Sequence, residues 1–262
     1  MRATRPDYFE RLANGQTPEY LWIGCADSRV PANEILGLAP GDVFVQRNVG
    51  NLAIPRDMNA MACLEYAVDV LKVKHVIVCG HYGCGAVKAA LTMPATTGGF
   101  VSHWVSDIRA TRDRHAAALR RLPGGPDARW QRLVELNVVH QVFNVVVAPI
   151  VQAAWARGQA LAVHGLVYAL ADGLLQEVTR PITCVADVDA AAADAAAAAE
   201  TGDVTHALLG EAFSTHRWFQ DTSTAAAEAE AVEEAGGVER VEGAARVAEE
   251  DGCCAAGACG GG

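Results

Sequence analysis

Apolar runs alternate with segments of helical periodicity along the first 180 residues of the chain. Three short apolar runs have the length and composition of buried strands, at 20–25, 43–47 and 75–80. Apolar residues near a spacing of 3.6, or a proline at the start of a short apolar segment, predict helices at 6–14, 31–38, 58–73 and 84–91. This alternation indicates an α/β fold, a mostly parallel central sheet flanked by helices.

The second half of this region continues the pattern with longer elements. Two long amphipathic helices are predicted at 101–121 and 128–157, with the sequence Pro-Gly-Gly-Pro between them. Two apolar segments, 161–170 and 174–179, predict a closing pair of strands around an Asp-Gly turn.

The composition changes near residue 185, which predicts a domain boundary there. From residue 181 onward the chain has 16 acidic and 3 basic residues, whereas the first 180 residues have 15 and 18. We therefore expect a folded domain at 1–185 and an acidic, Ala/Glu-rich extension at 186–262 that is largely disordered. One apolar island, 206–219, is interpreted as an amphipathic helix that docks on the core, with disorder as the alternative.

Composition narrows the class of protein further. The net charge of −10 belongs to the extension, and no basic stripe for nucleic acid is present. No apolar run has the length of a membrane span, and the amino end lacks the apolar stretch of a secretory signal. We expect a cytoplasmic protein, or an organellar one if a transit peptide has been removed.

Two short motifs follow predicted strands and carry candidate metal ligands. Cys25 ends the first strand, and His81 and Cys84 follow the third. Because ligands gather beyond the carboxyl ends of parallel strands, these residues are expected to meet and bind one zinc ion per subunit. Three protein ligands leave an open position, which is typical of catalytic zinc; a closed structural site would need a fourth ligand nearby. Two thiolates neutralise the dication, so activity is expected to rise on the alkaline side of neutrality.

Asp27 and Arg29 follow the first ligand directly. Their side chains suit a bidentate carboxylate–guanidinium pair, and Asp27 is also the one local group able to occupy the open position. The alternative is a helix N-cap and a surface ion pair ahead of the helix at 31–38.

At these residues the chain resembles the β-class carbonic anhydrases. The resemblance rests on Cys-Ala-Asp-Ser-Arg-Val from 25, Phe-Val-Gln-Arg-Asn-Val-Gly-Asn from 44 and His-Tyr-Gly-Cys-Gly from 81, and it covers residues 6–180. It implies zinc-dependent, reversible hydration of carbon dioxide to bicarbonate and a proton. In that reaction the catalytic Asp27–Arg29 dyad orients a zinc-bound hydroxide nucleophile.

The resemblance also implies two groups of binding residues. Gln16, Phe44 and Tyr66 match positions of the family's substrate pocket, and Phe44 and Tyr66 are alternatively plain core. A further trio, Trp22, Arg47 and Tyr168, matches an allosteric bicarbonate site of bacterial-type members. The alternative for this trio is a core aromatic and a structural ion pair. By the resemblance, a bicarbonate ion bound to this trio would favour the state in which Asp27 binds the zinc, and this state is inactive.

Three functions remain open at this point. Besides carbonic anhydrase, the same site suits a carbon disulfide or carbonyl sulfide hydrolase, and a zinc-bound interaction module without catalysis is the third hypothesis. A homodimer or homotetramer is expected, because the sheet-edge strand and the apolar helices suggest pairing across a two-fold axis, and such dimers form tetramers in related proteins. The expected partners are otherwise small molecules, carbon dioxide and bicarbonate, with no nucleic acid and no membrane.

Overall fold

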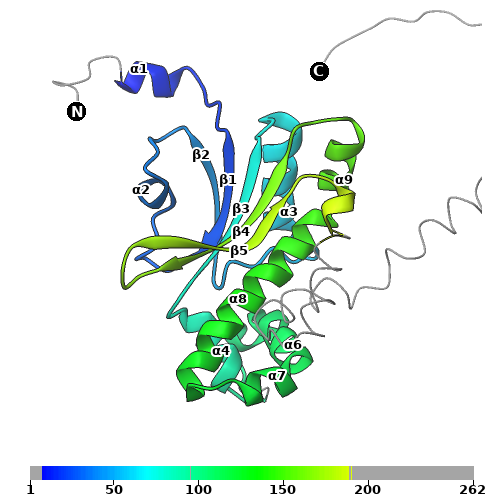
Figure 1. Ribbon diagram of the computed structural model, residues 1–262. Coiled ribbons are helices and arrows are strands. Elements are labelled where there is room, and N and C mark those ends of the chain that lie inside the picture. Colours follow the sequence, from blue (N-terminus) through cyan, green and yellow to red (C-terminus); the bar gives the residue numbers. More distant parts are fainter. Residues whose placement is uncertain (1–7, 95, 189, 191–262) are drawn as a thin grey trace, which may run out of the picture. The chain divides into compact units, whose positions relative to one another are not determined.

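The computed structural model describes residues 8–94, 96–188 and 190. Their centre is a five-stranded sheet in the order β2-β1-β3-β4-β5 (Figure 1). The strands are β1 (Tyr20–Cys25), β2 (Val43–Asn48), β3 (His75–His81), β4 (Ala162–Ala169) and β5 (Leu174–Ile182). The first four are parallel, and β5 runs antiparallel to β4. The predicted α/β fold with a mostly parallel sheet is confirmed.

The strands form where the sequence has continuous apolar runs. β1 and β3 are almost wholly buried because both have neighbours on each side and helices over both faces. Gly173 takes a left-handed conformation, with a φ of 77°, in the turn that reverses the chain into β5. β5 continues three residues beyond its predicted end at Thr179 and includes Pro181, which an edge strand tolerates because its outer N–H groups need no partner.

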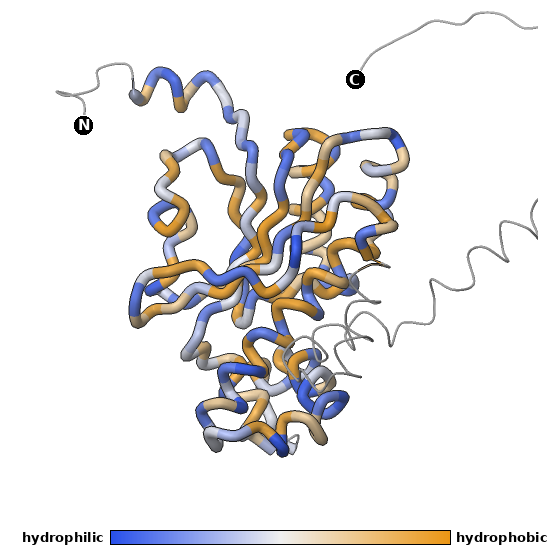
Figure 2. The backbone as a smooth tube through the Cα atoms, in the orientation of Figure 1, coloured by the Kyte–Doolittle hydropathy of each residue, from blue (hydrophilic) through white to orange (hydrophobic). Residues whose placement is uncertain are grey.

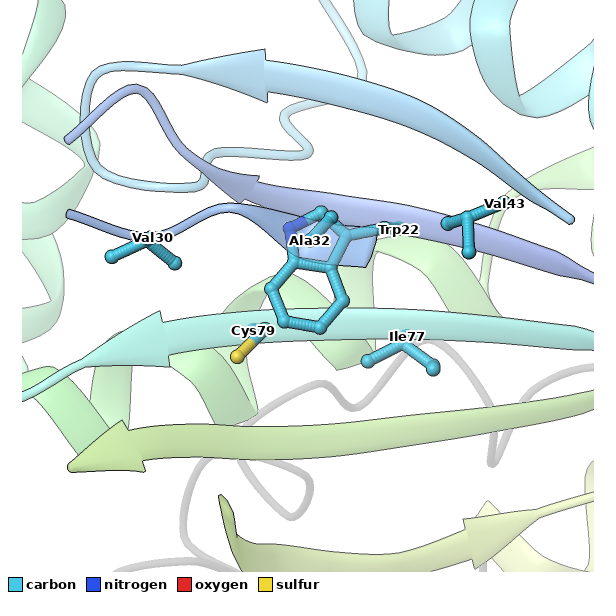
Figure 3. Close-up of a cluster of buried hydrophobic side chains, with 6 residues drawn as sticks. All are labelled: Trp22, Val30, Ala32, Val43, Ile77 and Cys79. Carbon is cyan, nitrogen blue, oxygen red and sulfur yellow. The ribbon is translucent and has the colours of Figure 1, made fainter. Parts of the chain in front are cut away.

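One face of the sheet packs against the short helix α2 (Ala32–Leu36). A cluster of buried residues lies there, consisting of Trp22, Val30, Ala32, Val43, Ile77 and Cys79. Figure 3 shows the Trp22 ring over β3, toward the side chains of Ile77 and Cys79. Trp22 is fully buried, so this indole is a main part of the core on the α2 side.

The opposite face is covered by α8 (Gly125–Val146), whose second half is almost continuously buried. Hydrophobic residues are concentrated on the strands and on this helix (Figure 2). The predicted single helix at 128–157 is wrong, because α8 ends at Val146 and α9 (Pro149–Ala156) begins after a bend of 58°. Pro149 has no N–H to continue the helical ladder, so the helix breaks before it.

The remaining helices depart from the predictions in two places. Predicted helices at 6–14 and 84–91 appear as α1 (Tyr8–Ala13) and α4 (Gly85–Thr92). The helix predicted at 58–73 is α3 (Met58–Glu65) followed by a turn of π-helix (Tyr66–Val70). The segment predicted as one helix at 101–121 is instead three, α5 (Phe100–Trp104), α6 (Ser106–Arg114) and α7 (Ala116–Arg121).

Among the described residues, no single helix has the length and apolarity to cross a membrane. The bent pair of α8 and α9 reaches that length and composition together, and most of its apolar residues are buried within this protein. The predicted extension from residue 186, with its helix at 206–219, lies almost entirely outside the described residues.

Candidate metal centre and active site

Three buried side chains meet at the carboxyl ends of two adjacent strands, β1 and β3. Cys25 and His81 are the last residues of β1 and β3, and Cys84 precedes the first residue of α4. Gly83, with a φ of 75°, makes the tight turn that brings Cys84 back beside His81. Their ligand atoms all lie within 4.8 Å of one another, so the structure brings the predicted metal ligands together.

The geometry of these atoms fits a zinc ion. The two sulfurs are 3.9 Å apart, and two sulfurs at zinc–sulfur bonds of 2.3 Å in a tetrahedral site lie about 3.8 Å apart. His81 Nδ1 is 3.1 Å from the Tyr82 carbonyl oxygen, to which it donates as N–H, whereas Nε2 is buried with no hydrogen-bond partner. An unpartnered imidazole nitrogen beside two sulfurs is a donor set that suits zinc.

The electrostatics of the thiol pair also favours a cation. The Cys84 thiol, 3.9 Å away, donates a hydrogen bond to the Cys25 sulfur, and this hydrogen bond lowers the pKa of Cys25. The same shared proton, together with burial, raises the pKa of Cys84. A buried site that already stabilises one thiolate is prepared for a positive ion.

Asp27 and Arg29 form a bidentate pair next to these ligands. Arg29 Nε donates to Asp27 Oδ1 at 2.9 Å and Nη2 donates to Oδ2 at 2.8 Å, while the Arg29 backbone N–H also reaches Oδ1 at 3.0 Å. These hydrogen bonds lower the pKa of Asp27 below its ordinary value. Asp27 Oδ2 is 3.7 Å from His81 Nε2, so the carboxylate borders the metal centre while it is paired with Arg29.

Two of the three predicted bicarbonate ligands lie together on the α2 side of the sheet. Tyr168 packs against the cluster that contains Trp22, and Trp22 Nε1 is buried with no partner among the described residues. Arg47 instead donates from Nε to the Cys25 carbonyl at 2.9 Å and from Nη2 to the Asp27 carbonyl. In this conformation Arg47 holds the backbone on both sides of Ala26.

The three predicted pocket residues are not all brought together. Phe44 and Tyr66 are in contact, with ring centroids 5.7 Å apart, and Tyr66 is 46% exposed. Gln16 is exposed in the segment between α1 and β1. Their role in a pocket therefore stays a prediction.

Sequence reasoning missed two residues that hold the backbone of the ligand Cys84 and of the loop after β2. Trp130 Nε1 donates to the Cys84 carbonyl at 3.0 Å, and Asn137 Nδ2 donates to the Gly50 carbonyl at 2.9 Å. Both lie on α8, where an apolar pattern suggested only packing. A signal was present: the stripe Asn137, His140, Gln141 and Asn144 places four polar side chains on one face of a buried helix.

Comparisons with known proteins agree with this site. A family profile described as carbonic anhydrase matches residues 20–175. A carbonic anhydrase of Emericella nidulans is 46% identical over 173 residues, which cover 66% of this chain and 75% of that protein. The structure of a Coccomyxa β-carbonic anhydrase in complex with acetazolamide is 54% identical, with a TM-score of 0.70, and the match covers 72% of this chain and 84% of that one.

The chain belongs to the β-class carbonic anhydrase family. This confirms the family expected from the motifs and, with it, the class of enzyme, a carbonate dehydratase. A tetrameric β-carbonic anhydrase of Sordaria macrospora is also similar in structure, with 39% identity and a TM-score of 0.65. That match covers 70% of this chain and 91% of the solved one, so the family fold accounts for the sheet and the helices around it.

Proposed function

We propose that the protein catalyses the reversible hydration of carbon dioxide to bicarbonate and a proton, with one zinc ion held by Cys25, His81 and Cys84. The observation that carries this proposal is the buried, unpartnered His81 Nε2 beside two sulfurs at a tetrahedral spacing. When bound, zinc would supply a Lewis acid that makes water nucleophilic near neutral pH. The carbonic anhydrases to which the chain is similar support the choice of substrate.

The Asp27–Arg29 pair has the role of orienting the attacking water. Asp27 is ionised at neutral pH because Arg29 lowers its pKa, so it accepts hydrogen bonds and donates none. The pairing through both carboxylate oxygens fixes its direction and opposes its movement onto the metal. In this role Asp27 holds a proton of the water at Oδ2, the oxygen nearest His81.

The aromatic pair Phe44 and Tyr66 is proposed to complete the substrate pocket together with Gln16 from a second copy of the chain. Phe44 lies on β2, which within the described part of the chain has a hydrogen-bonded neighbour on one side only. Exposed apolar side chains lie on this strand and on α1, including Val45, Phe9 and Leu12. A homodimer through this edge would bury them, and the tetrameric relatives support such an assembly.

A regulatory bicarbonate site at Trp22, Arg47 and Tyr168 is also proposed. Arg47 would have to leave the carbonyls of Cys25 and Asp27 to bind an anion, which would free the segment that carries Asp27. Binding there is thus coupled to the active site through one guanidinium.

The test of the main proposal is a stopped-flow assay of carbon dioxide hydration on the full chain, with zinc measured on the same sample. We expect about one zinc per chain and hydration that a chelator removes and added zinc restores. Carbonyl sulfide and carbon disulfide are assayed in parallel. Zinc-loaded protein that hydrates no carbon dioxide would contradict the proposal, and turnover of a sulfur substrate alone would assign the site to that hydrolysis.

A further inference from the structure

Two histidines that take no part in the proposed reaction lie side by side toward the amino end of the sheet. His75 is the first residue of β3, and His164 lies in the adjacent strand β4, opposite Ile77 (Figure 1). His81 of the metal centre is the last residue of β3, six residues beyond His75. At about 3.3 Å per residue, His75 lies roughly 20 Å from that centre, so the pair is separate from it.

The two imidazole rings each direct one nitrogen at the other. His75 Nδ1 is 3.1 Å from His164 Nε2, and the ring centroids are 5.2 Å apart. This spacing is that of a hydrogen bond in which one ring donates to the other. The His75 ring also stacks on Tyr20, with centroids 5.2 Å apart and an angle of 19° between the rings, which restricts its rotation.

The same spacing suits two ligands of a single metal ion. Imidazole nitrogens bind zinc at about 2.0–2.1 Å, so two of them on one tetrahedral or octahedral ion lie about 2.9–3.4 Å apart. Neutral imidazole is a good ligand for zinc, copper and nickel ions. An ion would take the place of the shared hydrogen, and the donor ring would carry its proton on its other nitrogen. No net proton release is needed, and the rings need move little.

The surroundings of the pair suit a hydrated cation with a carboxylate ligand. Both histidines are half-buried, so water can reach the ion from one side. Glu177 of β5 lies opposite Leu166, which shares a face of β4 with His164 because the two are two residues apart. A long side chain reaches such a diagonal neighbour. The positive charge of Lys74, next to His75, is offset by its ion pair with Glu19 at 2.5 Å.

We propose that His75 and His164 form a second metal site, which binds a divalent transition-metal ion such as Ni²⁺, Cu²⁺ or Zn²⁺, with Glu177 as a third ligand and water in the remaining positions. The ion would join β3, β4 and β5. The two histidines are 89 residues apart in the chain, so the unfolded protein does not present them together. A bound ion therefore stabilises the folded sheet.

The test is an isothermal titration of the full chain with Ni²⁺, after zinc loading, removal of excess zinc and blocking of exposed thiols with iodoacetamide. Blocking is needed because Cys184 is exposed and thiols compete for metal ions. We expect the wild type to bind Ni²⁺ and its melting temperature to rise with Ni²⁺ concentration. His75→Gln and His164→Gln should each weaken binding about tenfold or more, since losing even a residue behind a ligand costs about that much.

His103→Gln is the matched control, because it makes the same change at an exposed histidine of α5. Its affinity for Ni²⁺ should equal that of the wild type, whereas Glu177→Gln should fall between the wild type and the variants at 75 and 164. Unchanged hydration of carbon dioxide shows that each variant is folded.

A wild type that binds no Ni²⁺, or undiminished affinity in folded His75→Gln or His164→Gln, would overturn the inference. Undiminished affinity in Glu177→Gln would remove the carboxylate from the site. Wild type that hydrates no carbon dioxide bears on the proposed function alone, since the nickel titration does not depend on it.

Discussion

Replacement of Asp27 by asparagine tests the dyad with the smallest change of shape. The carboxylate accepts two side-chain hydrogen bonds from Arg29, at 2.9 and 2.8 Å. A carboxamide oxygen keeps one of them, and its NH₂ group faces an Arg29 donor or the metal centre with hydrogen in place of a lone pair. One orientation removes the acceptor that faces the metal centre, and the other sets the NH₂ group against the Arg29 donors that fix the direction of the side chain.

Removing one oriented polar group from an active site lowers kcat by about a hundredfold, which corresponds to about 2.7 kcal/mol of barrier. We therefore expect Asp27→Asn to retain zinc, since all three ligands remain, and to hydrate carbon dioxide about a hundredfold more slowly in a stopped-flow assay. Zinc content is measured on the same preparation, so loss of metal is not mistaken for loss of orientation.

Asp57→Asn is the matched control. Asp57 caps α3 by accepting from the Asn59 backbone N–H at 3.1 Å, and asparagine caps helices equally well. Its activity should equal that of the wild type. If zinc-loaded Asp27→Asn keeps a kcat/KM within about threefold of the wild type, the orienting role of the carboxylate is refuted.

Three further predictions concern pH, regulation and stability. Because Arg29 lowers the pKa of Asp27, this carboxylate stays ionised from pH 6 to 9. Two thiolates cancel the charge of the zinc ion, so the hydration rate should rise above neutral pH. A rate that stays flat over this pH range would contradict the prediction. Trp22→Val should relieve inhibition of the hydration rate by added bicarbonate, whereas unchanged inhibition would dismiss the regulatory site. Gly24→Ala should lower the free energy of unfolding by about 1–3 kcal/mol in urea denaturation, because the new Cβ would lie 2.0 Å from the buried Trp22 Nε1. An unchanged free energy of unfolding would refute this packing.

The sheet and the ligand set were predictable because their signals are local. Buried parallel strands appear as continuous apolar runs, and the ligands Cys25 and His81 come at the ends of two such runs. Once the strands are taken as parallel neighbours, their carboxyl ends meet at one edge, and the ligands with them.

The helical breaks were less visible. Apolar spacing stays nearly in phase across the π-helical turn at Tyr66–Val70 and across the breaks within 101–121, so periodicity does not report them. Pro149 was a signal, and it marks the start of α9.

The contacts that hold the ligands in place could not be predicted because each joins distant parts of the chain. Arg47 reaches the Cys25 carbonyl across 22 residues, and Trp130 reaches the Cys84 carbonyl across 46. Each of these donors leaves the ligand's own metal-binding atom free. The strand ends thus bring the sulfurs and the imidazole to one point, while the long-range donors fix the backbone that carries them. A metal centre held in this way is preorganised, so weakening one donor should alter metal affinity before it alters the fold.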